Sequence, residues 1–253
     1  IHKSKALTSV GGAGIANEYA FVDQIQKAIE SNGGKVNLVI SDGKKTVNLT
    51  KVTQAIQIGK EGEKQGWKGD AKVISSEGQT NFSIKQDGPF RWASVMKDYS
   101  DFYNAFMKKA AAGEIPGLSL KKDPNQPKVL MMWDTKNKKP YGRIFVKNAP
   151  GLDIKKLAFG PDNAIILQRT FTENDFKEGK NKLDITVSKI IKSVKDFEPG
   201  DMPVLEFERN ASKATQSKGL TGRGIILRVS PIERMQKAGS GANNLVIDYN
   251  DII

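Results

Sequence analysis

The chain has 253 residues with 40 Lys and Arg against 28 Asp and Glu, which gives a formal net charge of +12 and a pI of about 9.6. It has no cysteine and a single histidine, His2, so disulfides, zinc ribbons, iron–sulfur clusters, thiol catalysis and His-rich metal sites are excluded. Any catalysis must use carboxylates, lysine, hydroxyls and an oxygen-preferring cation such as Mg²⁺. A field of this sign attracts polyanions, chiefly nucleic acid, although a merely Lys-rich protein has the same composition.

The sequence also bears on where in the cell the protein is expected. No apolar run approaches the roughly 18 residues that a membrane span requires. The chain begins at Ile1 without the charged and apolar regions of a signal peptide. We therefore expect no membrane partner and a reducing, intracellular location.

The first predicted element is a helix from Asn17 to Asn32. Asn17 is a suitable cap, and the Gly33-Gly34 pair ends the helix. The apolar residues recur at helical spacing, and Glu18 falls on the same stripe. The spacing thus directs one carboxylate toward the core.

The next elements are strands. The stretch "KVNLVISDGKKTVNL" reads as a hairpin around Asp42-Gly43, and residues 50–66 read as a weaker helix or excursion. A strand over Asp70–Ile74 and a second over Asn81–Gln86 follow, with a turn between them. In the second strand Lys85 and Ser83 alternate with the apolar residues, which places Lys85 beside the strand of Asp70.

A long amphipathic helix is predicted over residues 90–113, with Trp92 and Met96 on its apolar face. By helical angle Asp98 lies at the inner edge of that face, whereas Asp101 points away. Only Asp98 is therefore expected to point inward.

Beyond a Pro- and Lys-rich connector the chain becomes β-rich, with one further helix predicted over Asn181–Val194. Accordingly, we expect a core domain over residues 1–115 and a β-rich region over 116–253. The predicted strands of this region are Lys128–Trp133, Arg143–Val146, Ala164–Arg169, Val204–Arg209, Gly224–Ser230 and Leu245–Tyr249.

The order of helix with an inward Glu, strand with Asp, neighbouring strand with Lys, and helix resembles the PD-(D/E)XK nuclease superfamily over roughly residues 10–112. The resemblance matches Glu18 to the glutamate of the first helix, Asp70 to the metal-binding aspartate and Lys85 to the catalytic lysine. It implies a restriction-endonuclease-like fold, with a mixed sheet flanked by helices.

The resemblance also implies a chemistry. In that superfamily carboxylates hold Mg²⁺ or Mn²⁺, the metal activates water, and the lysine orients the nucleophile or offsets charge in phosphodiester hydrolysis. This sequence has Ser83 where the family usually has Asp or Glu. Some restriction enzymes of the superfamily take the missing carboxylate from the following helix, and Asp98 is placed for that role. The resemblance therefore gives Asp70, Asp98 and Glu18 as metal ligands, with Lys85 as their catalytic partner.

A looser similarity links "SIKQDG" to proteins of large tailed phages, so the virion is a second location consistent with the sequence. The expected partner is DNA, and the sequence leaves the oligomeric state open, a homodimer included. The residues expected to bind nucleic acid are Arg91 and Trp92, Gln86 after the lysine, and Arg223 and Arg228 around a later strand.

Each feature also has an ordinary structural interpretation. Asp70 and Lys85 can be a cross-strand ion pair, and Glu18 a glutamate favoured by the helix dipole. Trp92 is more often a core residue. Glu206 and Glu208 share one strand face, which suits a metal but more often faces solvent. We thus expect a metal-dependent DNA endonuclease; the alternatives are a non-catalytic DNA-binding or virion-associated protein that kept the fold, and an RNA-binding protein with aromatics exposed on a sheet.

Overall fold

The computed structural model describes residues 12–88, 90–209, 224–236 and 243–253, and it is a mixed α/β chain in two compact units. Unit 1 comprises Ile1–Phe90 and Ile154–Phe197, and unit 2 comprises Arg91–Asp153 and Glu198–Ile253. The α/β class agrees with the prediction, but these boundaries do not coincide with the expected division after residue 115. Within the described parts, no helix has the length and apolar character needed to cross a bilayer.

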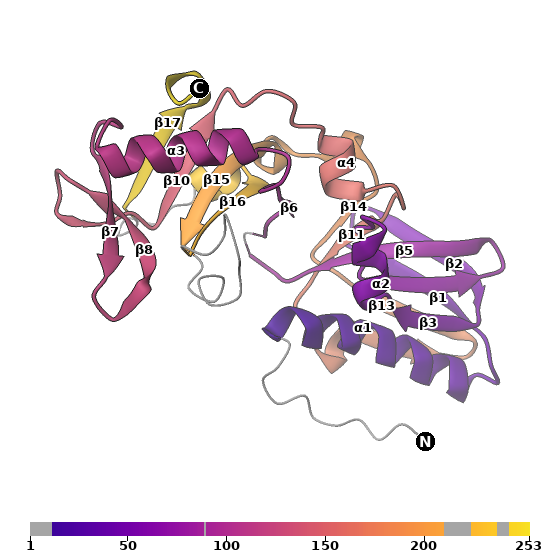
Figure 1. Cartoon of the computed structure of the whole chain (residues 1–253). Helices are drawn as coiled ribbons and strands as arrows, with labels where there is room; N and C mark the ends of the chain where they lie inside the picture. Colours follow the sequence, from indigo (N-terminus) through magenta and orange to yellow (C-terminus); the bar gives the residue numbers. More distant parts are fainter. Residues whose placement is uncertain (1–11, 89, 210–223, 237–242) are drawn as a thin grey trace. The chain divides into compact units, whose positions relative to one another are not determined.

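Unit 1 contains two sheets and the longest helix (Figure 1). The strand orders are β12-β13-β1-β2 and β14-β11-β5-β4-β3, with β1 parallel to β13 and β5 parallel to β11. Its elements are α1 (Gly12–Ser31), β1 (Val36–Ser41), β2 (Thr46–Val52), β3 (Gln54–Gln57), α2 (Gly59–Lys64), β4 (Ala71–Ser75), β5 (Gly78–Lys85), α4 (Ile154–Phe159), β11 (Ile165–Gln168), η1 (Glu173–Asp175), β12 (Phe176–Gly179), β13 (Lys182–Thr186), β14 (Lys189–Ile191) and η2 (Val194–Asp196).

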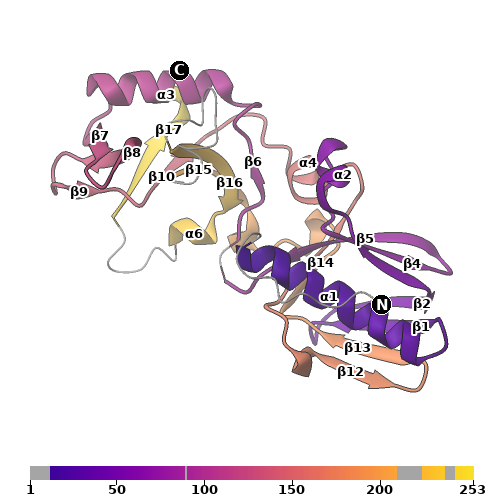
Figure 2. The same cartoon turned by 60° about the horizontal axis from the view of Figure 1, so that its bottom comes forward.

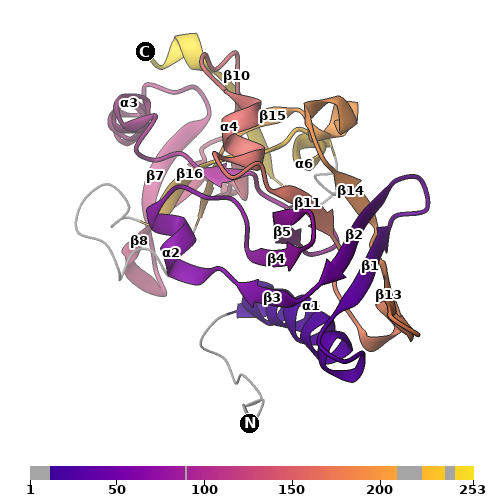
Figure 3. The ribbon, with the colours of Figure 1, turned by 90° about the vertical axis from the view of Figure 1, so that its right-hand side faces the viewer.

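The two sheets of unit 1 share one apolar core with α1. Phe21 of α1 packs edge-on against Phe82 of β5, with ring centroids 5.6 Å apart. Figure 3 shows α1 beside β3, the strand with which it makes its most extensive contacts. The helix ends as predicted, because Gly33 and Gly34 take the positive φ angles of 72° and 94° that non-glycine residues rarely adopt.

The start of α1 differs from the prediction. The helix begins at Gly12, so Asn17 lies inside it and is buried at 6% exposure instead of capping its end. Its amide is used elsewhere, in hydrogen bonds with the chain after β11. Because the Asn17 amide bonds to a distant segment, it does not cap the end of the helix, the position at which asparagine is usually favoured.

Unit 2 is a five-stranded sheet of order β17-β10-β15-β16-β6 and a three-stranded sheet of order β7-β8-β9. The β-rich character expected after residue 116 is confirmed. Its elements are β6 (Ala93–Ser94), α3 (Ser100–Ala112), β7 (Leu118–Asp123), β8 (Gln126–Asp134), β9 (Lys139–Pro140), β10 (Arg143–Lys147), η3 (Pro199–Asp201), β15 (Pro203–Arg209), β16 (Ile225–Pro231), α6 (Glu233–Gln236), β17 (Asn244–Asp248) and η5 (Tyr249–Asp251).

Helix α3 covers one face of the larger sheet through aromatic stacking. The rings of Phe106 and Phe207 are 3.8 Å apart between centroids, and Phe102 stacks on Tyr249 at 4.4 Å. Figure 2 shows α6 on the side of this sheet away from α3. The two faces of the sheet therefore have different neighbours, and the face away from α3 is the polar one described below.

The long helix predicted over residues 90–113 is wrong in its first half. Helix α3 starts only at Ser100, and Ala93 pairs with Val229 of β16 as part of the short strand β6. Trp92 is 6% exposed and its indole N–H donates to the carbonyl of Asp201. Strand pairing with β16 thus overrides the helical spacing of the apolar residues.

The helix predicted over Asn181–Val194 is also wrong. This segment forms β13 and β14, with Leu183, Ile185 and Val187 buried in strict alternation. A period of two is the strand signature, and β-branched residues favour it. The hairpin around Asp42 and the six strands predicted after residue 127 are confirmed, with shifts of no more than a few residues at their ends.

The β8–β9 turn yields a prediction on pH. Asp134 is 2% exposed and accepts hydrogen bonds from the backbone N–H groups of Lys136 and Asn137 and from the Asn137 and Asn243 side chains. These bonds, the Asn137 backbone bond first, lower the pKa of Asp134 to about 2. A depressed carboxylate pKa stabilises the fold above the unfolded value of about 4, and this stabilisation is lost as the pH falls toward 2.

We expect Asp134→Asn to destabilise the protein at pH 6, because its amide cannot accept all four bonds. The difference in unfolding free energy from the wild type should shrink as the pH falls from 4 to 2.5. Urea unfolding across this range measures it. A difference that stays constant would contradict the role of the ionised carboxylate.

Candidate functional site

The structure places Asp70 and Lys85 together at the end of the β4–β5 hairpin. The Lys85 Nζ lies 3.7 Å from Asp70 Oδ2, and both side chains are about one-quarter exposed, at 24% and 26%. Ser83 Oγ also donates to Asp70 Oδ2, over 3.2 Å. The adjacency predicted from strand alternation is therefore present.

Asp70 also has a structural role at this open end of the hairpin, which we call the Asp70 corner. Strand β4 begins at Ala71, so the backbone N–H of Ile84 in β5 extends beyond the paired part of β4. The Asp70 Oδ2 accepts that N–H at 2.7 Å, in place of the carbonyl that a longer β4 would supply. The carboxylate thus adds one hydrogen bond at the end of the β4–β5 ladder, and Lys85 offsets its charge.

Glu18 lies on the α1 side of the same sheet. Its Oε2 accepts a hydrogen bond of 2.9 Å from Nε2 of Gln57. Gln57 pairs with Ala71, and Ala71 with Phe82, so these three residues project toward α1. Ser83 and Lys85 alternate with Phe82 and project to the other face. Glu18 points inward as predicted, but toward β3.

Asp98 does not lie on a helix. It occupies an exposed turn before α3 and belongs to unit 2, whereas Asp70 belongs to unit 1. Together with Tyr99, Asp101 and Tyr249 it lines an open pocket of about 370 Å³. Burial raises the pKa of Tyr99, and the neighbouring Tyr249 and Asp98 raise it further. The helical angle used for Asp98 is wrong because α3 begins two residues later.

The expected metal ligands do not form a carboxylate cluster in the described part of the chain. No three His, Asp or Glu side chains there are grouped so that they could hold a metal ion. The side chains that contact the Asp70 carboxylate there are Ser83 and Lys85, a hydroxyl and a cation. A single carboxylate falls short of the ligand set that Mg²⁺ or Mn²⁺ usually takes.

The residues expected to contact nucleic acid are used in different ways. Gln86 donates to the carbonyl of Ala13 at the start of α1, and Trp92 is in the core. Arg91 and Arg228 both pair with Glu208. Arg223 lies outside the described residues.

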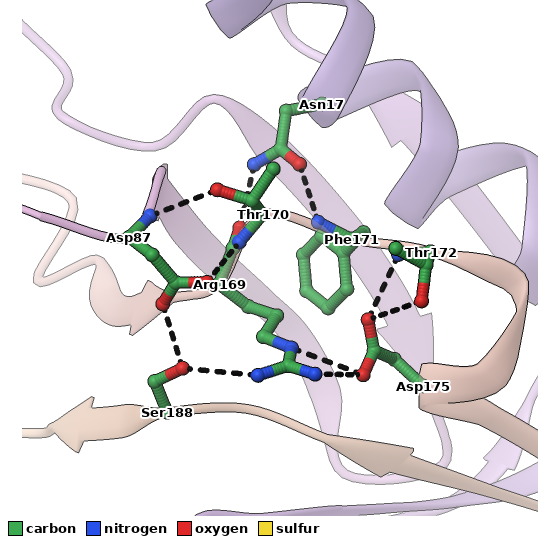
Figure 4. Close-up of polar contacts among 8 residues, drawn as sticks. All are labelled: Asn17, Asp87, Arg169, Thr170, Phe171, Thr172, Asp175 and Ser188. Carbon is green, nitrogen blue, oxygen red and sulfur yellow. Dashed lines mark hydrogen bonds and ion pairs between the residues drawn. The ribbon is translucent and has the colours of Figure 1, made fainter.

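The ends of the parallel strands β5 and β11 carry a hydrogen-bond network that the sequence analysis did not identify (Figure 4). The Asn17 amide donates to the carbonyl of Arg169 and accepts from the N–H of Phe171, both at 2.8 Å. Asp87 accepts from the N–H of Thr170 at 3.0 Å and from the hydroxyl of Ser188 at 2.6 Å. The network joins α1, the loop after Lys85 and the loop after β11.

The same network contains an ion pair whose carboxylate is buried and whose arginine is one-third exposed. Asp175 is 3% exposed and accepts from Arg169 Nε at 3.0 Å and from the N–H of Thr172 at 2.8 Å. Burial alone would raise the pKa of Asp175, but the bonds from Arg169 and Thr172 outweigh it and hold the pKa below its usual value. A sequence signal existed here, because Thr172-x-x-Asp175 is a capping box.

A second buried ionic group lies in unit 2 on β15. Glu206 is fully buried and Glu208 is 6% exposed, so they do not form a solvated strand face. Arg234 Nε and Nη2 bind the two Glu206 oxygens at 2.9 and 3.0 Å, and Arg143 Nε lies 3.1 Å from Oε1. Burial alone would raise the pKa of Glu206, but the bonds from Arg234 and the charge of Arg143 hold it below its usual value.

Comparison of the chain with protein-family models, with curated proteins and with solved structures finds no match. The resemblance to the PD-(D/E)XK nucleases therefore stays a prediction from the sequence.

The Asn17 network yields a prediction on stability. Asn17→Ala removes one donor and one acceptor and leaves the N–H of Phe171 buried without its partner, so we expect a loss of about 2 to 3 kcal/mol in unfolding free energy. Asn48→Ala on β2, where Asn48 is exposed, is the matched control and should change stability by less than about 0.5 kcal/mol. Equal values in urea titrations would show that the bonds are not structural.

Proposed function

We propose that this chain binds DNA through contacts with its phosphate backbone. The observation that carries the proposal is the way the charges are sorted between the interior and the surface. The buried acidic residues are Asp123, Asp134, Asp175, Asp201, Glu206 and Glu208. In contrast, no lysine among the described side chains is buried.

This sorting strengthens the external field. Each buried carboxylate is surrounded by hydrogen-bond donors or arginine, so it cannot meet an approaching ligand. The lysines remain in water and can neutralise phosphates, which releases the counterions condensed on DNA. The charge that lysine contributes to the net +12 therefore lies at the surface of the described residues.

We expect a labelled 20-base-pair duplex to bind in fluorescence anisotropy, with an affinity that falls steeply as salt rises. For B-DNA the slope of log K against log salt is about −0.9 per neutralised phosphate, so several contacts give a slope of about −4 or steeper. An affinity that does not change between 50 and 200 mM salt would contradict the proposal. A single-stranded oligonucleotide and an RNA duplex, titrated in parallel, test the preference for DNA.

A second candidate is metal-dependent hydrolysis of DNA on a restriction-endonuclease-like core. The specific support is the Asp70–Lys85 pair, 3.7 Å apart on neighbouring strands in the order of the PD-(D/E)XK motif. The single carboxylate at the corner weakens it, because the superfamily uses a larger ligand set. DNA binding without cleavage, the alternative that the sequence left open, therefore comes first.

Lys85→Ala separates the two candidates. If the corner hydrolyses DNA, this variant should lose nicking of a supercoiled plasmid in Mg²⁺ or Mn²⁺ and keep its duplex affinity within about threefold. Lys72→Ala is the matched control, since Lys72 is a partly buried lysine of β4 on the same sheet face. Asp98→Asn tests the proposed replacement carboxylate. Wild-type protein that leaves the plasmid intact in both metals would exclude the hydrolytic candidate.

A further inference from the structure

The polar face of the large sheet in unit 2 is organised by register. Arg143 of β10 is opposite Glu208 of β15, and Glu206 is opposite Arg228 of β16. Directly opposed residues project to the same face, so two arginines and two carboxylates meet side by side. Phe207, which lies between the glutamates, projects to the other face and stacks on α3.

Two more arginines reach these carboxylates. Arg91, just before β6, donates through Nε to Glu208 Oε2 at 2.8 Å. Arg234 of α6 binds Glu206 with both arms of its guanidinium and lies 3.9 Å from Glu208. In these ion pairs four guanidinium charges therefore contact two carboxylates.

This imbalance costs free energy in a half-buried setting. Burial lowers the pKa of Arg143, and the nearby charges of Arg234 and Arg91 lower it further, against the opposing charges of Glu206 and Glu208. Burial likewise lowers the pKa of Arg228, and Arg91 and Arg234 act in the same direction against the opposing charges of Glu208 and Glu206. An anion bound beside these like charges lowers the repulsion between them.

Three of the four arginines are accessible. The side chains of Arg91, Arg143 and Arg228 are 37%, 33% and 25% exposed, whereas Arg234 is only 3% exposed. A guanidinium has five N–H donors, and the bonds to glutamate use only part of them. Because the buried carboxylates fix each guanidinium, little side-chain entropy remains to be lost on binding.

We propose that Arg91, Arg143 and Arg228 form a phosphate-binding site on the face of this sheet away from α3, with Glu206 and Glu208 as positioning residues. The site deepens the proposed function, since it rests on DNA as the source of the phosphate. The planar fork of arginine matches the oxygens of a phosphate, which lysine meets only as a point charge. This is the chemistry that distinguishes the site from the scattered surface lysines.

The first test is the salt dependence of duplex binding. The double variant Arg143→Gln/Arg228→Gln should bind at least tenfold more weakly at 100 mM salt, and the slope of log K against log salt should become shallower by about two. Lys108→Gln on α3 is the control, because it removes one exposed charge over the opposite sheet face. The control should change the slope by no more than about one.

Arg143→Lys separates geometry from charge. It keeps the positive charge and loses the fork, so the site predicts a weakened affinity, whereas charge alone predicts wild-type binding. Thermal unfolding of each variant must show a folded state at the temperature of the titration. If the double variant and the Lys108→Gln control bind alike, the site is overturned while DNA binding stands.

A second measurement applies if the wild type fails to bind DNA, which would refute the proposed function. Inorganic phosphate is then titrated at constant ionic strength while the arginine Nε–Hε resonances are followed by NMR. The site predicts shifts of the Arg143 and Arg228 signals that saturate with phosphate. Phosphate should also raise the melting temperature of the wild type more than that of the double variant. Shifts that do not saturate would overturn the site itself.

Discussion

A carboxylate withdrawn from water must be matched by hydrogen-bond donors or by a cation, and this constraint organises both units. An ion left without partners in the interior costs several kcal/mol or neutralises itself by protonation. Asp175 meets the constraint through Arg169 and Thr172, and Glu206 meets it through Arg234 and Arg143. The partners of Asp175 lie within six residues of it and fix the loop after β11, whereas those of Glu206 come from α6 and β10 and hold separate segments together.

The same constraint links the fold to the surface. Six acidic residues are buried while the lysines of the described residues stay at the surface, so the exposed side chains of the described residues include more cations than anions. The structural use of carboxylates and the proposed attraction of polyanions therefore rest on one arrangement. A basic protein whose acids were spread over the surface would have the same net charge and a weaker local field.

Local patterns predicted what depends on neighbouring residues. The Asp42-Gly43 hairpin, the end of α1 and the placement of Lys85 beside Asp70 all follow from turn chemistry and alternation. The helix predicted through Trp92 failed because pairing with β16, more than 130 residues away, decides that segment. Helical spacing cannot reveal such a partner, and Asp98 was misplaced as a consequence.

The ionic group around Glu206 was hidden for a related reason. The alternation in "VLEFER" placed Glu206 and Glu208 on one strand face, which was correct. Their burial depended on which arginines stood opposite, and that required the register of β10, β15 and β16. In an antiparallel sheet the register comes from long connections as well as turns, and no short motif encodes it.

The Asp70–Lys85 pair and the arginine face of unit 2 differ in whether a contribution to stability is enough to explain their geometry. The Asp70–Lys85 pair is partly exposed and contributes about 1 kcal/mol or less, and the Asp70 carboxylate already accepts a backbone N–H of β5. Its geometry is accounted for without catalysis.

Four arginines on two glutamates are harder to explain in this way, because even balanced buried pairs often fail to stabilise a fold and surplus positive charge adds repulsion. Arg234 already binds both oxygens of Glu206, and Arg143 brings a second positive charge to the same carboxylate. A ligand that brings negative charge removes this excess, which is why the arginine face supports a function more strongly than the motif that first indicated a nuclease.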